Sequence, residues 1–130
     1  MPTLYLIPTL LADDTADRVL PPTIREVIEK TDAYFVENIR TARRFITGLK
    51  TSRVIDATTF FELSKDTPPA DTRRQIQEMM ERKRNVGVLS EAGCPGVADP
   101  GAVVVGMAHA LGWRVEPLVG PSSILLALMA

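Results

Sequence analysis

The segment SEAGCPGVADPG, at Ser90–Gly101, has the composition of a rigid ligand-binding loop. Its glycines permit positive φ angles or a close approach of the backbone to another group, and its two prolines restrict the turns between them. Such a loop exposes backbone N–H and C=O groups to a small ligand. Glu91, near its start, can accept hydrogen bonds from ligand hydroxyls or balance a cation. The alternative is a tight connection in which the glycines serve only the geometry of the turn.

A second segment, VGPSS at Val119–Ser123, combines a Gly-Pro pair with two hydroxyl side chains. Serine is also a common helix N-cap, so these hydroxyls are equally compatible with a purely structural role. Each of the two segments follows a predicted apolar strand. Their occurrence at neighbouring strand ends favours a shared pocket.

The chain offers few side chains for acid–base or nucleophilic chemistry. Glu37 ends a predicted strand and is the candidate proton acceptor, but it can equally pair with Arg40 or Arg43, or cap a helix. Cys94 has no histidine near it in the sequence, so a small packed thiol is favoured over a nucleophile. Because the chain has one cysteine and one histidine, His109, we expect no Cys/His zinc site.

The composition is that of one domain without a strong overall attraction to nucleic acid or membrane. The 15 Lys and Arg against 16 Asp and Glu give the 130 residues a net charge of −1. No segment reaches the roughly 18 apolar residues of a membrane span, and the N-terminus lacks the basic start of a signal peptide. We therefore expect a protein without membrane contact that functions in the cytoplasm. Any nucleic-acid contact must be local.

Apolar runs alternate with helix-spaced segments along the chain. Strands are predicted at Thr3–Pro8, Ala33–Glu37, Arg53–Leu63, Val86–Ser90 and Trp113–Leu118. Helices are predicted after Thr23 and Asn38 as N-caps, over Asp71–Arg84, over Gly101–Leu111 and from Ser122 or Ser123. Strands that are apolar throughout and separated by helices predict an α/β fold, a mostly parallel five-stranded sheet flanked by helices.

The predicted sheet brings the candidate residues to one edge. Ligands of open parallel α/β sheets bind outside the carboxyl ends of the strands. The functional loops should therefore follow Ile7, Val36, Leu89 and Leu118. These loops contain Glu37 and both glycine–proline segments.

Four segments, taken in order, resemble the tetrapyrrole methylase superfamily of S-adenosylmethionine-dependent methyltransferases: LYLIPTLL, FVENIRTARRFI, SEAGCPGVADPG and PLVGPSS. The similarity is greatest to the branch that methylates ribosomal RNA, and it extends over nearly the whole chain. The resemblance implies S-adenosylmethionine as the cofactor, ribosomal RNA as the substrate, a ribose 2′-hydroxyl as the acceptor, and a homodimer.

The same resemblance implies two α/β domains with the cofactor between them, and residues 1–130 resemble only the N-terminal one. We expect a C-terminal domain to complete the site. We also expect the 130-residue chain alone to be inactive and to bind the cofactor poorly. The apolar stretch Ser122–Ala130 would then be covered by that domain or by a second subunit.

The resemblance places the cofactor-binding residues in three loops. They are Pro8 after the first strand; Ser90, Glu91, Ala92, Gly93, Cys94, Pro95, Val97 and Ala98 in the glycine-rich loop; and Ser122 and Ser123 in the last turn. If the acceptor is a ribose hydroxyl, Glu37 is the candidate catalytic proton acceptor.

Other functions remain open. Methylation of a porphyrin or corrin is one alternative within the superfamily. A nicotinamide dehydrogenase is disfavoured because the segment LIPTLLADD, after the first strand, has no glycine and hence no GxGxxG motif. A non-catalytic α/β domain that binds a nucleotide or a partner protein is the third alternative.

Overall fold

Segments of four or five residues form the strands of one sheet in the computed structural model, which describes residues 2–97 and 99–130. The strands in that part of the chain are β1 (Thr3–Ile7), β2 (Ala33–Val36), β3 (Thr59–Glu62), β4 (Val86–Leu89) and β5 (Arg114–Pro117). Their order in the sheet is β3-β2-β4-β1-β5, and every neighbouring pair is parallel. The predicted five-stranded α/β fold is confirmed.

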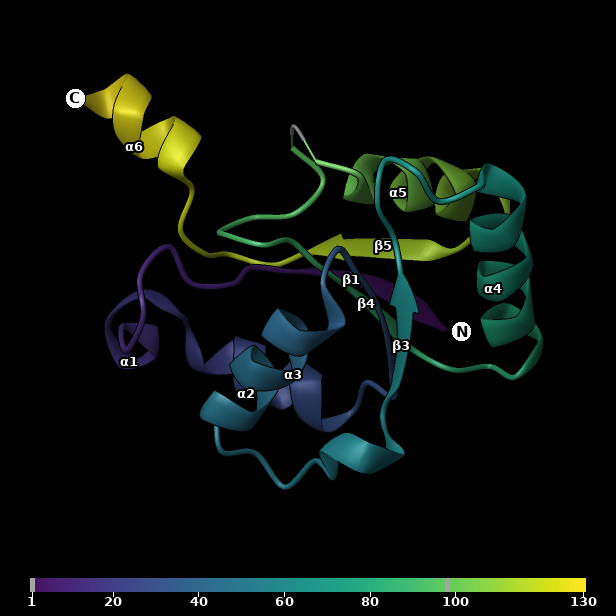
Figure 1. The fold of residues 1–130 in the computed structure, drawn as a ribbon, viewed down its shortest axis with the longest axis horizontal. Helices are drawn as coiled ribbons and strands as arrows, with labels where there is room; N and C mark the ends of the chain where they lie inside the picture. The colour runs from purple at the N-terminus through teal and green to yellow at the C-terminus, as the bar shows by residue number, and fades with distance from the viewer. Residues whose placement is uncertain (1, 98) are drawn as a thin grey trace.

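Helices cover both faces of this sheet (Figure 1). The helices of the described residues are α1 (Ala16–Val19), α2 (Pro22–Glu29), α3 (Ile39–Gly48), α4 (Pro69–Glu81), α5 (Gly101–Ala110) and α6 (Ser123–Met129), with a 3₁₀ turn at Ile55–Ala57. On one face, Ile24 and Ile28 of α2 and Ile46 of α3 pack around Tyr34. On the other face, residues of α4 and α5 pack around Phe35. Tyr34 and Phe35 belong to different cores because successive side chains of a strand point to opposite faces of the sheet.

The connections after β3 and β4 run on the opposite face of the sheet from those after β1 and β2. The chain leaves β1 and β2 towards α2 and α3, whereas it leaves β4 towards α5 on the opposite face. Because β4 lies between β1 and β2, the loops diverge on both sides of its carboxyl end. Such switch points are where open α/β sheets leave a crevice for ligands.

Two local predictions are wrong. The segment 53–57, predicted as part of a strand, contains the 3₁₀ turn instead, and only Thr59–Glu62 pairs with β2. There the Thr58 hydroxyl donates to the carbonyl of Val54, a side-chain bond that competes with strand pairing. Helix α2 begins at Pro22 without a side-chain cap, rather than after Thr23. Proline is well suited to the first helical turn because the N–H it lacks has no partner there.

Candidate active site

The loops that follow β1 and β4 are tied together at the carboxyl edge of the sheet. The Thr9 backbone N–H donates a hydrogen bond of 3.0 Å to the Gly93 carbonyl, and the Thr9 hydroxyl donates one of 3.3 Å to the Ser90 carbonyl. The Ser90 hydroxyl in turn donates to the Gly93 carbonyl over 2.7 Å. These bonds fix the start of the glycine-rich loop against β1.

The glycine-rich loop also meets the turn that follows β5. Gly93 has a φ of +71°, and a Cβ added to it would lie 2.8 Å from the Pro121 carbonyl oxygen. A Cβ on Gly120 would overlap the Pro8 ring. The Cys94 thiol approaches the Pro121 carbonyl to 3.3 Å. Glycine is therefore required at both positions for this close approach of the two segments.

A small hollow of about 250 Å³ opens where these loops meet. Its lining residues come from the ends of β2, β4 and β5: Glu37, Ser90, Glu91, Ala92, Cys94, Val97, Asp99, Ser122, Ser123 and Ile124. Three of them are carboxylates and none is a lysine or arginine. We call this space the acidic hollow.

Glu37 faces the acidic hollow without a partner among the described residues. Arg43 pairs with Asp56 instead, and the cap of α3 is Asn38, whose side chain accepts from the Thr41 N–H. Burial raises the pKa of Glu37, and the nearby carboxylates of Asp99 and Glu91 raise it further. The two structural alternatives for Glu37, pairing with an arginine and capping, are therefore absent from the described part of the chain.

The other two carboxylates are held in place by hydrogen bonds. The Thr41 hydroxyl donates to Glu91 over 3.0 Å. Asp99 accepts from the backbone N–H groups of Gly96 and Gly101 over 3.0 and 2.8 Å. None of these three bonds neutralises the charge of its carboxylate. Sequence reasoning did not select Asp99, although an acidic residue inside a glycine-rich loop was the available signal.

The predicted site residues fall into three groups. Those that line the acidic hollow are Glu37, Ser90, Glu91, Ala92, Cys94, Val97, Ser122 and Ser123. Pro8, Gly93 and Pro95 are buried beside it, and Ala98 lies outside the described residues. The Ser122 side chain also caps α6 by accepting from the Leu125 N–H, the structural role that the sequence left open. Burial raises the pKa of the Cys94 thiol, in agreement with a packed thiol.

A second hollow, of about 470 Å³, lies between α3 and the loop after β1. Its walls combine apolar and polar side chains: Thr9, Leu10, Asp13, Asp14, Ala16, Asn38, Thr41, Ala42, Arg44, Phe45, Gly48, Leu49, Leu89, Ser90 and Glu91. Only Ser90 and Glu91 were selected from the sequence. They line both hollows, and we call this second space the α3 hollow.

Two further searches cover the described residues only. Within 2–97 and 99–130, no group of three or more His, Cys, Asp or Glu is placed to hold a metal ion. In the same ranges, no helix has the length and apolar character needed to cross a membrane.

The fold is shared with a solved methyltransferase structure. The chain is similar to uroporphyrin III C-methyl transferase from Thermus thermophilus, with a TM-score of 0.62 and 16% identity over 96% of this chain and 51% of that one. At this identity the likeness concerns the fold. No protein-family model matches the chain.

The curated relatives are more specific. Ribosomal RNA small subunit methyltransferase I from Buchnera aphidicola is 28% identical over 98% of this chain, and the protein of that name from Bacillus subtilis is 28% identical over all of it. The relative from Mesorhizobium japonicum reaches 49% identity over 47 residues. The chain spans 42% and 41% of the length of the first two. The predicted resemblance to the tetrapyrrole methylase superfamily, in its ribosomal-RNA-modifying branch, is confirmed.

Proposed function

We propose that residues 1–130 form the S-adenosylmethionine-binding domain of a methyltransferase that modifies ribosomal RNA at a ribose 2′-hydroxyl. A second domain would complete the cleft. The similarity of the whole chain to ribosomal RNA methyltransferases supports the class of reaction. The single structural observation that carries the proposal is the charge of the acidic hollow.

The acidic hollow suits a cationic ligand. Three carboxylates line it, and burial raises the pKa of Glu37, with a smaller contribution from the repulsion of Asp99 and Glu91. S-adenosylmethionine carries a sulfonium and an ammonium group, which such a site attracts. The pyrophosphate of a nicotinamide dinucleotide would be repelled by the same carboxylates. This difference favours the methyltransferase over the dehydrogenase.

The size of the acidic hollow supports a two-domain site. Ligand pockets typically enclose about 300–1,000 Å³, whereas this hollow has about 250 Å³. It therefore provides part of the wall that a ligand of this size needs. The relatives, which are more than twice as long as the matched region, have chain beyond it.

The loops after β4 and β5 would hold the cofactor through their backbone, and Glu91 would bind its ribose hydroxyls or its positive charge. When bound, S-adenosylmethionine supplies an activated methyl group, so the protein has to position the acceptor and exclude water. Glu37 would accept the proton of the ribose hydroxyl. Its raised pKa makes it a stronger base than an ordinary carboxylate.

A tetrapyrrole acceptor is the alternative that the structural neighbour suggests. The likeness to that protein concerns the fold, whereas the curated relatives matched over nearly all of the chain are named as ribosomal RNA enzymes. We therefore propose RNA, and not a tetrapyrrole, as the substrate. The homodimer and the cytoplasmic location stay predictions.

Titration of the 130-residue chain with S-adenosylhomocysteine and with NAD⁺ tests the proposal. We expect weak calorimetric binding of S-adenosylhomocysteine, with amide shifts at residues 90–97 and 119–124, and no binding of NAD⁺. Preferential binding of NAD⁺ by this chain, or no binding of S-adenosylhomocysteine by a protein that includes the second domain, would contradict the cofactor assignment. Micromolar affinity together with methyl transfer by this chain alone would contradict the need for a second domain.

A further inference from the structure

The α3 hollow adjoins the acidic hollow. Ser90 and Glu91 line both spaces, and the hydrogen bond from Thr41 to Glu91 ties α3 to the glycine-rich loop at their boundary. A ligand in one hollow therefore lies next to a ligand in the other. The volume of the α3 hollow, about 470 Å³, lies within the usual range for small-molecule sites.

The walls of the α3 hollow have a distinct chemistry. Leu10, Phe45 and Leu89 provide apolar surface, and the side chains of Asn38 and Thr41 provide hydrogen-bonding groups. Arg44 is the only basic residue among its lining residues. Within residues 2–97 and 99–130, Arg44 has no ion-pair or hydrogen-bond partner, unlike its neighbour Arg43, which pairs with Asp56.

We propose that the α3 hollow is the acceptor subsite and takes one nucleotide of RNA, with the base against the wall around Phe45 and a phosphate on Arg44. Bases of single-stranded RNA commonly bind by stacking on aromatic side chains, and guanidinium groups bind phosphate. The inference rests on the proposed function, because it places the acceptor beside the proposed cofactor site.

The charges favour a nucleotide over a tetrapyrrole. A single guanidinium matches the single phosphate of a nucleotide. A porphyrin-type acceptor carries several carboxylates, and these would face Asp13, Asp14 and Glu91 with only Arg44 to balance them. The carboxylates of the wall can instead accept hydrogen bonds from the N–H groups of a base.

Uridine 5′-monophosphate is the probe, since an adenine nucleotide could enter the cofactor site. It is titrated into the 130-residue chain in the presence of excess S-adenosylhomocysteine, and binding is followed by amide chemical shifts. We expect shifts at residues 9–16 and 38–49. Inorganic phosphate alone should shift only the region of Arg44, which separates recognition of the phosphate from recognition of the nucleoside.

Gly48→Leu blocks the hollow with little risk to the fold. Gly48 lines the hollow, and a Cβ added there meets no atom within 4 Å. Gly106 of α5 is the matched control because its added Cβ is equally unobstructed and it lines neither hollow. We expect Gly48→Leu to weaken uridine monophosphate binding by about tenfold or more, the effect of losing about 1.4 kcal/mol. Gly106→Leu should leave it unchanged.

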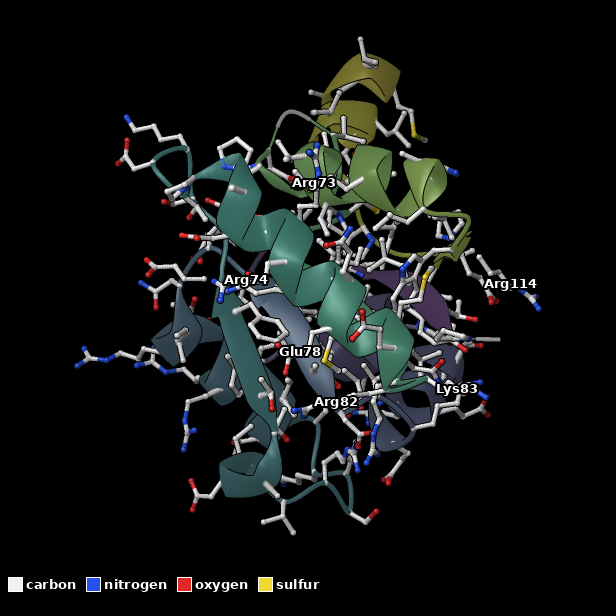
Figure 2. All side chains as sticks on the ribbon, turned by 90° about the vertical axis from the view of Figure 1, so that its right-hand side faces the viewer. Arg73, Arg74, Glu78, Arg82, Lys83 and Arg114 are labelled. Atoms are coloured by element: carbon white, nitrogen blue, oxygen red, sulfur yellow. The ribbon has the colours of Figure 1, made fainter. Side chains whose placement is uncertain are left out.

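Arg44→Gln tests the phosphate contact. Its matched control is Arg73→Gln, which removes the same charge from the exposed surface of α4 (Figure 2). We expect a several-fold loss of affinity for the nucleotide and for inorganic phosphate with Arg44→Gln only. Melting temperatures of all four variants identify any that fail to fold.

The outcomes separate the two proposals. Nucleotide shifts outside 9–16 and 38–49, or equal effects of Gly48→Leu and Gly106→Leu, would overturn the acceptor subsite while S-adenosylhomocysteine binding still supports the proposed function. Absence of S-adenosylhomocysteine binding by a protein that also contains the second domain would overturn the proposed function itself. Equal effects of Arg44→Gln and Arg73→Gln would overturn the phosphate contact.

Discussion

The two ends of the parallel sheet treat their charged groups in opposite ways. At the amino end, Asp32 pairs with both Arg53 and Arg84. At the carboxyl end, Glu37 and Glu91 share the acidic hollow with Asp99, and none of its described lining residues is a lysine or arginine. Both ends have carboxylates, but only one end neutralises them.

Hydrogen bonding shows the same contrast. Near the amino end, Ser52 donates to Glu29 through its hydroxyl and its backbone N–H, and these bonds lower the pKa of Glu29. At the carboxyl end, burial and neighbouring carboxylates raise the pKa of Glu37. At the amino end of the sheet, the protein pairs its carboxylates with arginines or hydrogen-bond donors. At the carboxyl end, where we propose that a ligand binds, it leaves the charge of its carboxylates unneutralised. Changes at the carboxyl end should therefore affect binding most, and changes at the amino end stability most.

The largest expected effect is that of Gly120→Ala. The added methyl group would overlap Pro8, so the turn after β5 has to move away from β1 and from the glycine-rich loop. We expect a loss of about 1–3 kcal/mol in stability and a loss of S-adenosylhomocysteine affinity of about tenfold or more. Thermal unfolding and calorimetry measure the two effects.

Gly106→Ala is the control for Gly120→Ala. Gly106 lies in α5, and a Cβ there meets nothing within 4 Å. Alanine should raise stability by about 1 kcal/mol through helix propensity and leave binding unchanged. Full cofactor affinity in Gly120→Ala would show that the contact between the loops does not shape the site.

The next largest effect is that of Glu91→Gln. Glutamine can still accept from the Thr41 hydroxyl, so the melting temperature should hardly change, while the negative charge is lost. We expect affinity to fall by about tenfold, the value of one charge-assisted hydrogen bond. If Glu91 binds the positive charge, S-adenosylmethionine loses more affinity than S-adenosylhomocysteine, whereas equal losses indicate contact with the ribose. Unchanged affinity for both would remove Glu91 from the site.

The sequence was sufficient for the features that depend on neighbouring residues. Apolar runs located β1, β2 and β4, and Asn38 was found as a cap because it bonds to Thr41, three positions along the chain. The loops after β4 and β5 were found by their glycines and prolines. Their contact depends on the sheet order, which the general rule for parallel sheets supplied.

The sequence was insufficient where the relevant neighbour is distant along the chain. The α3 hollow exists because α3 packs at a distance from the loop after β1, and no local pattern encodes that spacing. Asp99 gains its importance from lying near Glu37, which belongs to another strand end. The segment 53–57 was misassigned because its β-branched residues suit a strand as well as a turn bonded through Thr58.

A moderate effect on stability alone is expected for Asp32→Asn. The substitution weakens the pairs with Arg53 and Arg84, which are partly exposed, so the cost should be roughly 1 kcal/mol. Affinity for S-adenosylhomocysteine should stay the same because Asp32 lies at the opposite end of β2 from the acidic hollow. A large loss of affinity would contradict the separation of the two ends.

The smallest expected effect is that of Glu37→Gln, which should raise the stability of the protein instead of lowering it. Because the folded state raises the pKa of Glu37 above 4.5, the folded state holds this proton more tightly than the unfolded chain does. The protonated Glu37 side chain therefore contributes to the stability of the unmodified protein below pH 4.5, and this contribution is lost as the pH rises through the raised pKa. Glutamine cannot ionise, so it keeps that part.

The melting temperature of Glu37→Gln relative to the unmodified protein should accordingly rise with pH and level off above the raised pKa. Glu81→Gln, at an exposed position at the end of α4, is the control for the loss of one carboxylate. A relative melting temperature that falls with pH would mean that Glu37 has a favourable partner in the folded state. The carboxyl end would then neutralise its charges as the amino end does, and the proposed attraction of a cationic cofactor would lose its basis.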